Sequence, residues 1–178
     1  MPIEPEIGLT KETVYDGKLF KVYRETVRLA NGSVRPREIV AHPGAVALVF
    51  VDDADLLLMV RQYRHAAGKV LLEIPAGTRE AGEDSETCAR REVQEETGYQ
   101  ARKVERLGGF YSAPGFCTEF LDCYLMTDLT ESPGEADEDE NIEVERLSAD
   151  EALARIRSGE ICDAKSICGI MLWLHHNS

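Results

Sequence analysis

Three glutamates lie close together in one predicted helix, at a spacing that could hold a metal ion. They belong to the segment Arg91-Glu92-Val93-Gln94-Glu95-Glu96. At about 100° per residue, Glu95 and Glu96 lie about 60° and 40° to either side of Glu92, so the three carboxylates share one helix face. Oxygen-only ligands favour Mg²⁺ or Mn²⁺ over zinc. The helix alone leaves a second interpretation open, a solvated acidic face in an acidic protein.

The residues around this helix form a long pattern of fixed spacing. Gly77 is followed after five residues by Glu83, and after seven more by the segment that runs from Arg91 to Gly98. This pattern resembles the Nudix box, Gly-x5-Glu-x7-Arg-Glu-U-x-Glu-Glu-x-Gly-U, in which U is aliphatic. Every fixed position matches. The one departure is Tyr99 at the last aliphatic position, which should affect packing more than chemistry.

The flanking segments are similar to the ADP-ribose pyrophosphatase branch of that family, from about Tyr15 to the last predicted helix. They are Val60-Arg61-Gln62-Tyr63-Arg64 and Leu72-Glu73-Ile74-Pro75-Ala76-Gly77 before the helix, and Phe110-Tyr111-Ser112-Ala113-Pro114-Gly115-Phe116 after it. Many members of the branch have serine directly before this proline, where Ala113 stands in this chain.

The resemblance implies a role for individual residues. Two or three Mg²⁺ ions, for which Mn²⁺ can substitute, would be held by Glu92, Glu96, the backbone carbonyl of Ala76, and Glu140. Glu138 would be the general base. An alternative for the acidic segment of Glu138 and Glu140 is a solvated loop, and which of the two is the base stays open. The other catalytic residues would be Glu95, as a further ligand directly or through water, and Arg91, which would orient a glutamate of the box. Glu83 is expected to fix the loop–helix structure.

The implied reaction is hydrolysis of the pyrophosphate bond of ADP-ribose to AMP and ribose 5-phosphate. Arg64 would bind a phosphate, because guanidinium groups match phosphate oxygens. Further substrate contacts are expected from Arg61, Glu73 and Gly115. One alternative is a different nucleoside diphosphate derivative, such as GDP-mannose or NADH. Another is a catalytically silent nucleotide-sensing Nudix domain, which the presence of all three helix glutamates disfavours.

The elements predicted around the box indicate a mixed sheet flanked by helices. The resemblance implies that they form an α/β (α+β) domain, a Nudix-type α/β/α sandwich, over residues 44–178. The run from Ala45 to Val51 predicts a buried strand. A helix is predicted from Ser85 to Thr97, because Asp84 or Ser85 can cap its start and Gly98 its end. Further strands are expected near residues 56–61, 68–74, 102–111, 120–127 and 142–147. A further helix is expected to open at the capping box Ser148-Ala149-Asp150-Glu151 and to stop at Gly159, and a last one to cover about 163–175.

A small antiparallel β-meander is predicted over residues 1–43. Its strands would cover residues 13–15, 18–29 and 35–42, separated by the turn signals Asp16-Gly17 and Asn31-Gly32. In the resembling branch this lobe is swapped across a homodimer and helps to hold adenine, which implies base-stacking roles for Lys18, Leu19 and Phe20. The alternative is that Leu19 and Phe20 pack in the core.

Composition excludes several classes of partner. The net charge of −13 argues against non-specific binding to nucleic acid or to anionic membranes. No apolar run approaches the roughly 18–20 residues that a membrane span needs. The acidic N-terminus lacks the features of a signal peptide, so a cytoplasmic location is expected. The five cysteines include no CxxC pair, which disfavours a zinc site or a disulfide framework.

Overall fold

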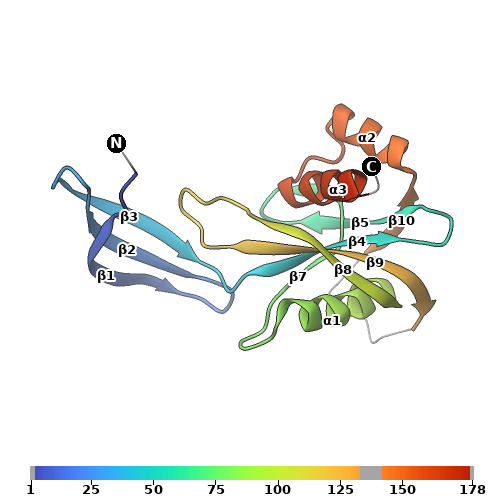
Figure 1. Ribbon diagram of the computed structural model, residues 1–178, viewed down its shortest axis with the longest axis horizontal. Helices are drawn as coiled ribbons and strands as arrows, with labels where there is room; N and C mark the ends of the chain where they lie inside the picture. Colours follow the sequence, from blue (N-terminus) through green and yellow to red (C-terminus); the bar gives the residue numbers. More distant parts are fainter. Residues whose placement is uncertain (1–2, 133–141, 177–178) are drawn as a thin grey trace. The chain divides into compact units, whose positions relative to one another are not determined.

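A computed structural model of the protein describes residues 3–132 and 142–176, and the chain divides into two compact units (Figure 1). The first unit contains Met1–Gly44 and Tyr111–Phe120, and the second contains Ala45–Phe110 and Leu121–Ser178. Within the described ranges, no helix has both the length and the apolar character that crossing a membrane requires.

The first unit is built on a three-stranded antiparallel sheet in the order β1-β2-β3, as the turn signals predicted. Its strands are β1 (Ile7–Asp16), β2 (Lys21–Arg28) and β3 (Val34–Ala41). The second turn depends on Gly32, whose φ of 81° suits glycine. The 111–120 segment joins the end of β3, since the backbone N–H of Val40 donates to the carbonyl of Phe116 at 2.8 Å.

The second unit contains a seven-stranded mixed sheet, which confirms the predicted fold class. Its order is β10-β5-β4-β9-β8, with β6 paired to β5 and β7 paired to β4. The central strand β4 runs antiparallel to β5 and parallel to β9. The bounds are β4 (Ala45–Val51), β5 (Leu57–Arg64), β6 (Lys69–Glu73), β7 (Ala76–Thr78), β8 (Tyr99–Tyr111), β9 (Phe120–Glu131) and β10 (Glu143–Leu147).

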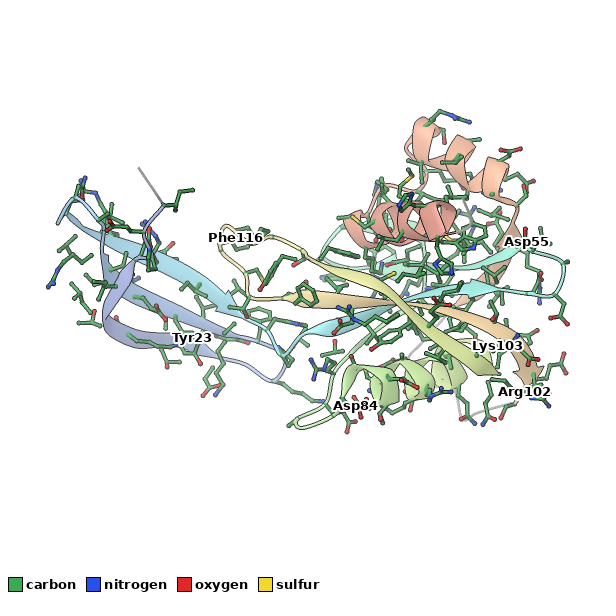
Figure 2. The ribbon with its side chains drawn as sticks, viewed as in Figure 1. Tyr23, Asp55, Asp84, Arg102, Lys103 and Phe116 are labelled. Carbon is green, nitrogen blue, oxygen red and sulfur yellow. The ribbon has the colours of Figure 1, made fainter. Side chains whose placement is uncertain are left out.

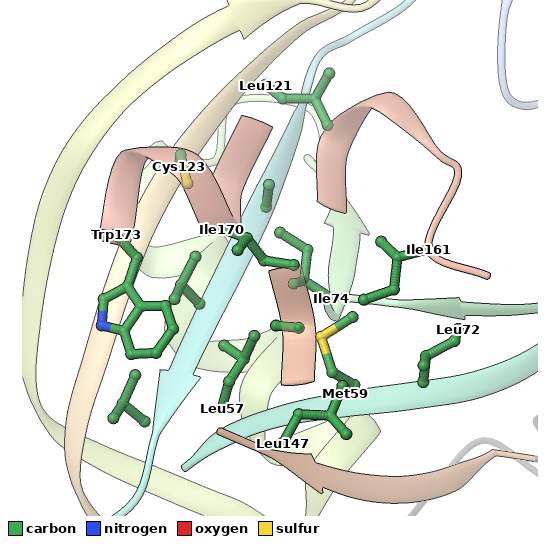
Figure 3. Packing of buried hydrophobic residues seen from close by; sticks show 14 of the residues in the cluster. Leu57, Met59, Leu72, Ile74, Leu121, Cys123, Leu147, Ile161, Ile170 and Trp173 are labelled. Carbon is green, nitrogen blue, oxygen red and sulfur yellow. The ribbon is translucent and has the colours of Figure 1, made fainter. Parts of the chain in front are cut away.

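Helices cover both faces of this sheet, as expected of an α/β/α sandwich. On one face lie α2 (Ala149–Ser158) and α3 (Ala164–His176), and on the other lies α1 (Ser85–Thr97) (Figure 1). Ile170 and Trp173 of α3 pack with Met59 and Ile74 in the first core cluster (Figure 3). A second cluster joins the sheet to α1. All seven residues of β4 are buried because this strand lies between both layers.

The helix α1 begins and ends at the predicted residues. The carboxylate of Asp84, labelled in Figure 2, accepts hydrogen bonds from the backbone N–H groups of Glu86 and Thr87 at 3.1 and 3.0 Å. Gly98 closes the helix with a φ of 70°. The buried residues of α1 are Cys88, Ala89 and Val93, which pack in the second cluster. Packing through these residues fixes how the helix presents its glutamates.

Candidate active site

Glu92, the first of the three clustered helix glutamates, packs directly against Gly77. A Cβ atom at Gly77 would lie 1.8 Å from Cδ of Glu92, far inside any permitted contact. Only glycine therefore leaves room for this carboxylate beside β7. Strand β7 is held in place by its pairing with β4, in which Ala76 lies opposite Ala47. The fold thus brings Glu92 beside the short strand that contains Ala76. Both residues are predicted metal ligands.

One guanidinium group joins three glutamates of the box. Arg91 bonds to Glu83 at 3.1 Å, to Glu92 at 2.8 Å and to Glu95 at 2.9 Å. The hydrogen bond from Arg91 is the main cause that lowers the pKa of Glu83 to about 2. Glu83 also accepts from the backbone N–H of Glu80 at 3.0 Å, which ties the loop before α1 to the helix. These contacts are consistent with an orienting role for Arg91 and a structural role for Glu83.

Arg64, the predicted phosphate ligand, is held by the buried carboxylate of Glu73. The Nε and Nη2 atoms of Arg64 donate to Oε1 and Oε2 of Glu73 at 2.8 and 3.1 Å. Burial opposes the charge of Arg64, but the bonds to Glu73 and the fields of Glu96 and Asp163 raise its pKa overall. The negative charge of Glu96, on the carboxylate helix, thus favours the charged form of Arg64. A guanidinium has five N–H donors, and the pair with Glu73 uses two.

Arg61 lies on the opposite face of β5. Side chains alternate along a strand, so Arg61 projects with Met59 toward the layer of α2 and α3, whereas Arg64, three residues further on, projects to the other side of β5. Arg61 bonds to Glu145 at 2.7 Å and to Glu160 at 2.6 Å. The structure therefore separates Arg61 from the box residues.

The remaining predicted substrate-binding residues belong to the first unit. Lys18, Leu19 and Phe20 form the connection between β1 and β2. Leu19 and Phe20 are 52% and 37% exposed, so the alternative that they pack in the core is wrong. Phe20 lies beside Tyr15, with ring centroids 5.7 Å apart. Gly115 faces open space, because a Cβ atom there would meet no atom within 4 Å.

The donor set beside Gly77 fits a hard divalent cation. Carboxylate and carbonyl oxygens are the ligands that Mg²⁺ and Mn²⁺ prefer. The predicted base Glu138 and ligand Glu140 lie outside the described residues. Over 3–132 and 142–176, no three His, Cys, Asp or Glu side chains are grouped closely enough to hold a metal by themselves.

Two residues beside the predicted site were missed by the sequence analysis. Lys165 and Asp163, at the start of α3, join the ion pair of Arg64 and Glu73. Lys165 donates to Oε2 of Glu73, and also to Asp163 at 3.0 Å. No local signal could have found this contact, because Lys165 lies 92 residues from Glu73 along the chain.

Comparisons with known proteins agree with the motif. Residues 41–167 match the NUDIX domain family. The chain is 42% identical over 167 residues to the ADP-ribose pyrophosphatase of Bacillus subtilis (strain 168), covering 93% of this chain and 90% of the relative. It is 39% identical over 167 residues to the methanol dehydrogenase activator of Bacillus methanolicus, with the same coverage of 93% and 90%.

A solved structure has the same fold. The protein titled "Crystal structure of ADP compounds hydrolase" superposes with a TM-score of 0.88 at 24% identity, covering 100% of this chain and 98% of that one. The predicted resemblance is confirmed, and the chain belongs to the Nudix family.

Proposed function

We propose that this protein hydrolyses the pyrophosphate bond of ADP-ribose, with Mg²⁺ or Mn²⁺ as cofactor, to give AMP and ribose 5-phosphate. The observation that carries the proposal is the packing of the Glu92 carboxylate into the space left by Gly77, on the helix that also holds Glu95 and Glu96. The relative in Bacillus subtilis, 42% identical, is named for action on ADP-ribose, which supports this substrate.

The residues of the site supply what pyrophosphate hydrolysis requires. Glu92, Glu96, the carbonyl of Ala76, and Glu140 would hold two or three cations. When bound, such ions neutralise phosphate charge and lower the pKa of a coordinated water. Glu138 would accept the proton of the attacking water. Arg91 holds Glu95 beside Glu92, so Glu95 can act as a further ligand, directly or through water.

Arg64 would bind the phosphates with the N–H donors that Glu73 does not use. A guanidinium group binds phosphate better when its orientation is already fixed. The bidentate contact with Glu73 fixes the orientation of the Arg64 guanidinium. Arg61 is assigned a structural role instead, because Glu145 and Glu160 hold it on the other face of β5. In the first unit, Lys18, Leu19, Phe20 and Gly115 are proposed to contact the nucleotide.

Product analysis on ADP-ribose tests the function. AMP and ribose 5-phosphate should form with Mg²⁺ and should disappear when EDTA removes the metal. A parallel panel with GDP-mannose and NADH tests the substrate. A kcat/KM for another diphosphate more than about tenfold above that for ADP-ribose would replace the proposed substrate. No turnover on the whole panel would favour a silent nucleotide-sensing domain.

The assignment of the base is tested by two substitutions. We expect Glu138→Gln to keep metal affinity and to slow hydrolysis by about 10²–10⁴, the usual contribution of a general base. Glu140→Gln should instead weaken metal binding, measured by the Mg²⁺ concentration at half-maximal rate. The opposite pair of results would exchange the two roles.

The protein is also proposed to act as a cytoplasmic homodimer. Every residue of β1 is exposed, which suits a strand that packs against a second copy of the chain. All five cysteines are free thiols, as is usual in a reducing compartment.

A further inference from the structure

The buried carboxylate of Glu73 is bound by two cations. Glu73 is 1% exposed, and its partners are Arg64 from β5 and Lys165 from the first turn of α3. Its Oε1 accepts from Arg64, and its Oε2 accepts from both Arg64 and Lys165. A carboxylate this deep in the fold needs strong compensation. Arg64 alone already pairs with it through both oxygens, so the second cation calls for a separate explanation.

The segment that contains Lys165 is held in place by hydrogen bonds. The Nζ of Lys165 also donates to Asp163, whose carboxylate caps α3 by accepting from the backbone N–H of Ser166 at 3.1 Å. The buried hydroxyl of Ser166 in turn accepts from the backbone N–H of Ile74 at 2.9 Å, directly after β6. The start of α3 is thus fastened to the strand that carries Glu73.

The side chain of Arg64, by contrast, needs a contact with another residue to fix its orientation. Arg64 is the last residue of β5, and its side chain is 40% exposed. A long exposed side chain loses rotamer entropy when it binds a phosphate, unless another contact has already fixed it. The two parallel hydrogen bonds fix the orientation of the guanidinium relative to the Glu73 carboxylate. Whatever fixes that carboxylate also fixes the orientation of Arg64.

We propose that Lys165 is a positioning residue for phosphate binding, which acts through Glu73 to hold the guanidinium of Arg64 toward the substrate. The inference rests on the proposed function of Arg64 as a phosphate ligand. Lys165 itself contacts neither phosphate nor metal in this scheme. It contributes equally to binding of the substrate and of the transition state, so its loss should be seen in KM more than in kcat.

The test compares three variants with the wild-type enzyme. Lys165→Met removes the charge and keeps most of the length, and Lys165→Arg keeps the charge. Lys103→Met is the matched control, since Lys103 is exposed on β8 (Figure 2). With ADP-ribose and Mg²⁺, we expect Lys165→Met to raise KM about 5–20-fold and to change kcat by less than about threefold. Lys165→Arg should recover most of the loss, and Lys103→Met should match the wild type.

A double-mutant cycle separates positioning from a general loss of positive charge. If Lys165 acts through Arg64, Lys165→Met should add less than about twofold to the KM of Arg64→Lys, whereas independent effects would multiply. Thermal unfolding of each variant checks that the fold is retained. Multiplying effects, or a Lys165→Met variant with wild-type KM, would overturn the inference.

A binding measurement keeps this test independent of turnover. The probe is the ADP-ribose analogue in which a methylene group replaces the bridging oxygen of the diphosphate, titrated calorimetrically with Mg²⁺ present. Lys165→Met should weaken its binding about as much as it raises KM. A wild-type chain that binds the analogue without cleaving ADP-ribose would contradict the proposed function and leave the inference standing. Equal affinities in the wild type and Lys165→Met, or no binding by either, would overturn the inference.

Discussion

At the scale of single residues, the contact between Gly77 and Glu92 places the tightest constraint on the site. Gly77→Ala would place a Cβ atom 1.8 Å from Cδ of Glu92. The carboxylate or β7 must then move, which we expect to cost about 1–3 kcal/mol of folding stability. It should also lower the affinity for Mg²⁺, measured from the metal dependence of the rate. An unchanged Mg²⁺ dependence in Gly77→Ala would contradict the assigned position of Glu92.

The metal assignment of Glu92 and Glu96 predicts a large effect on rate. Glu92→Gln and Glu96→Gln each keep side-chain size and remove one negative charge, so kcat should fall by about 10²–10⁵. Glu86→Gln on the same helix is a suitable control, because Glu86 is exposed and pairs with Arg90 at 2.8 Å. Near wild-type turnover in both test variants would rule out the metal site.

Without a motif, residue contacts were predictable only where they are local. Arg91 and Glu95 are four residues apart, so helix geometry alone brings them together. The contact of Lys165 with Glu73 joins two elements that are distant in sequence, and no pattern in either segment indicates it. Arg64 was predicted as the phosphate ligand and Arg61 as a further substrate contact in the same motif, but strand alternation places the two on opposite faces of β5.

At the scale of elements, the ion pair of Glu83 and Arg91 joins the loop before α1 to the helix. Arg91 lowers the pKa of Glu83 to about 2, from an ordinary value of 4.5. A depressed carboxyl pKa stabilises the fold fully above the unfolded value, and the stabilisation is lost as pH falls through the folded value. The contribution of this pair should therefore be constant above about pH 4.5 and decline toward about pH 2.

Glu83→Gln tests this pH dependence. The difference in unfolding midpoint between wild type and Glu83→Gln should be constant at neutral pH and should shrink between about pH 4.5 and 2. Glu80→Gln serves as the control, since Glu80 contributes its backbone N–H to this contact. A difference that already vanishes at pH 5 would show that Arg91 does not lower the pKa of Glu83 in solution.

The elements themselves were predicted best where their ends carry strong local signals. The helix α1 has a capping aspartate and a terminal glycine, and it begins and ends as expected. The strand β5 continues to Arg64, beyond the predicted end at Arg61, because its last residues pair with β6. That pairing depends on a neighbouring strand, and a periodic pattern in one segment cannot reveal it.

At the scale of the whole molecule, the strand β1 has an exposed edge that we expect a second copy of the chain to cover. It is a ten-residue strand at the edge of its sheet, with every residue exposed. Its exposed apolar side chains include Ile7, Leu9, Val14 and Tyr15. Long exposed edge strands readily pair with other chains, and natural proteins usually shorten or cover them. A second copy of this chain would provide that cover.

Light scattering tests the homodimer directly. The wild-type protein should have twice the chain mass of 19.8 kDa. Val14→Lys places a charge on β1 and should shift the equilibrium toward the single-chain mass, because a lysine buried in an apolar interface loses hydration. Met171→Lys, at an exposed apolar position on α3, introduces the same charge and should leave the mass unchanged. A wild-type mass near 19.8 kDa would rule out the dimer, and a Met171→Lys monomer would place the interface on α3 instead of β1.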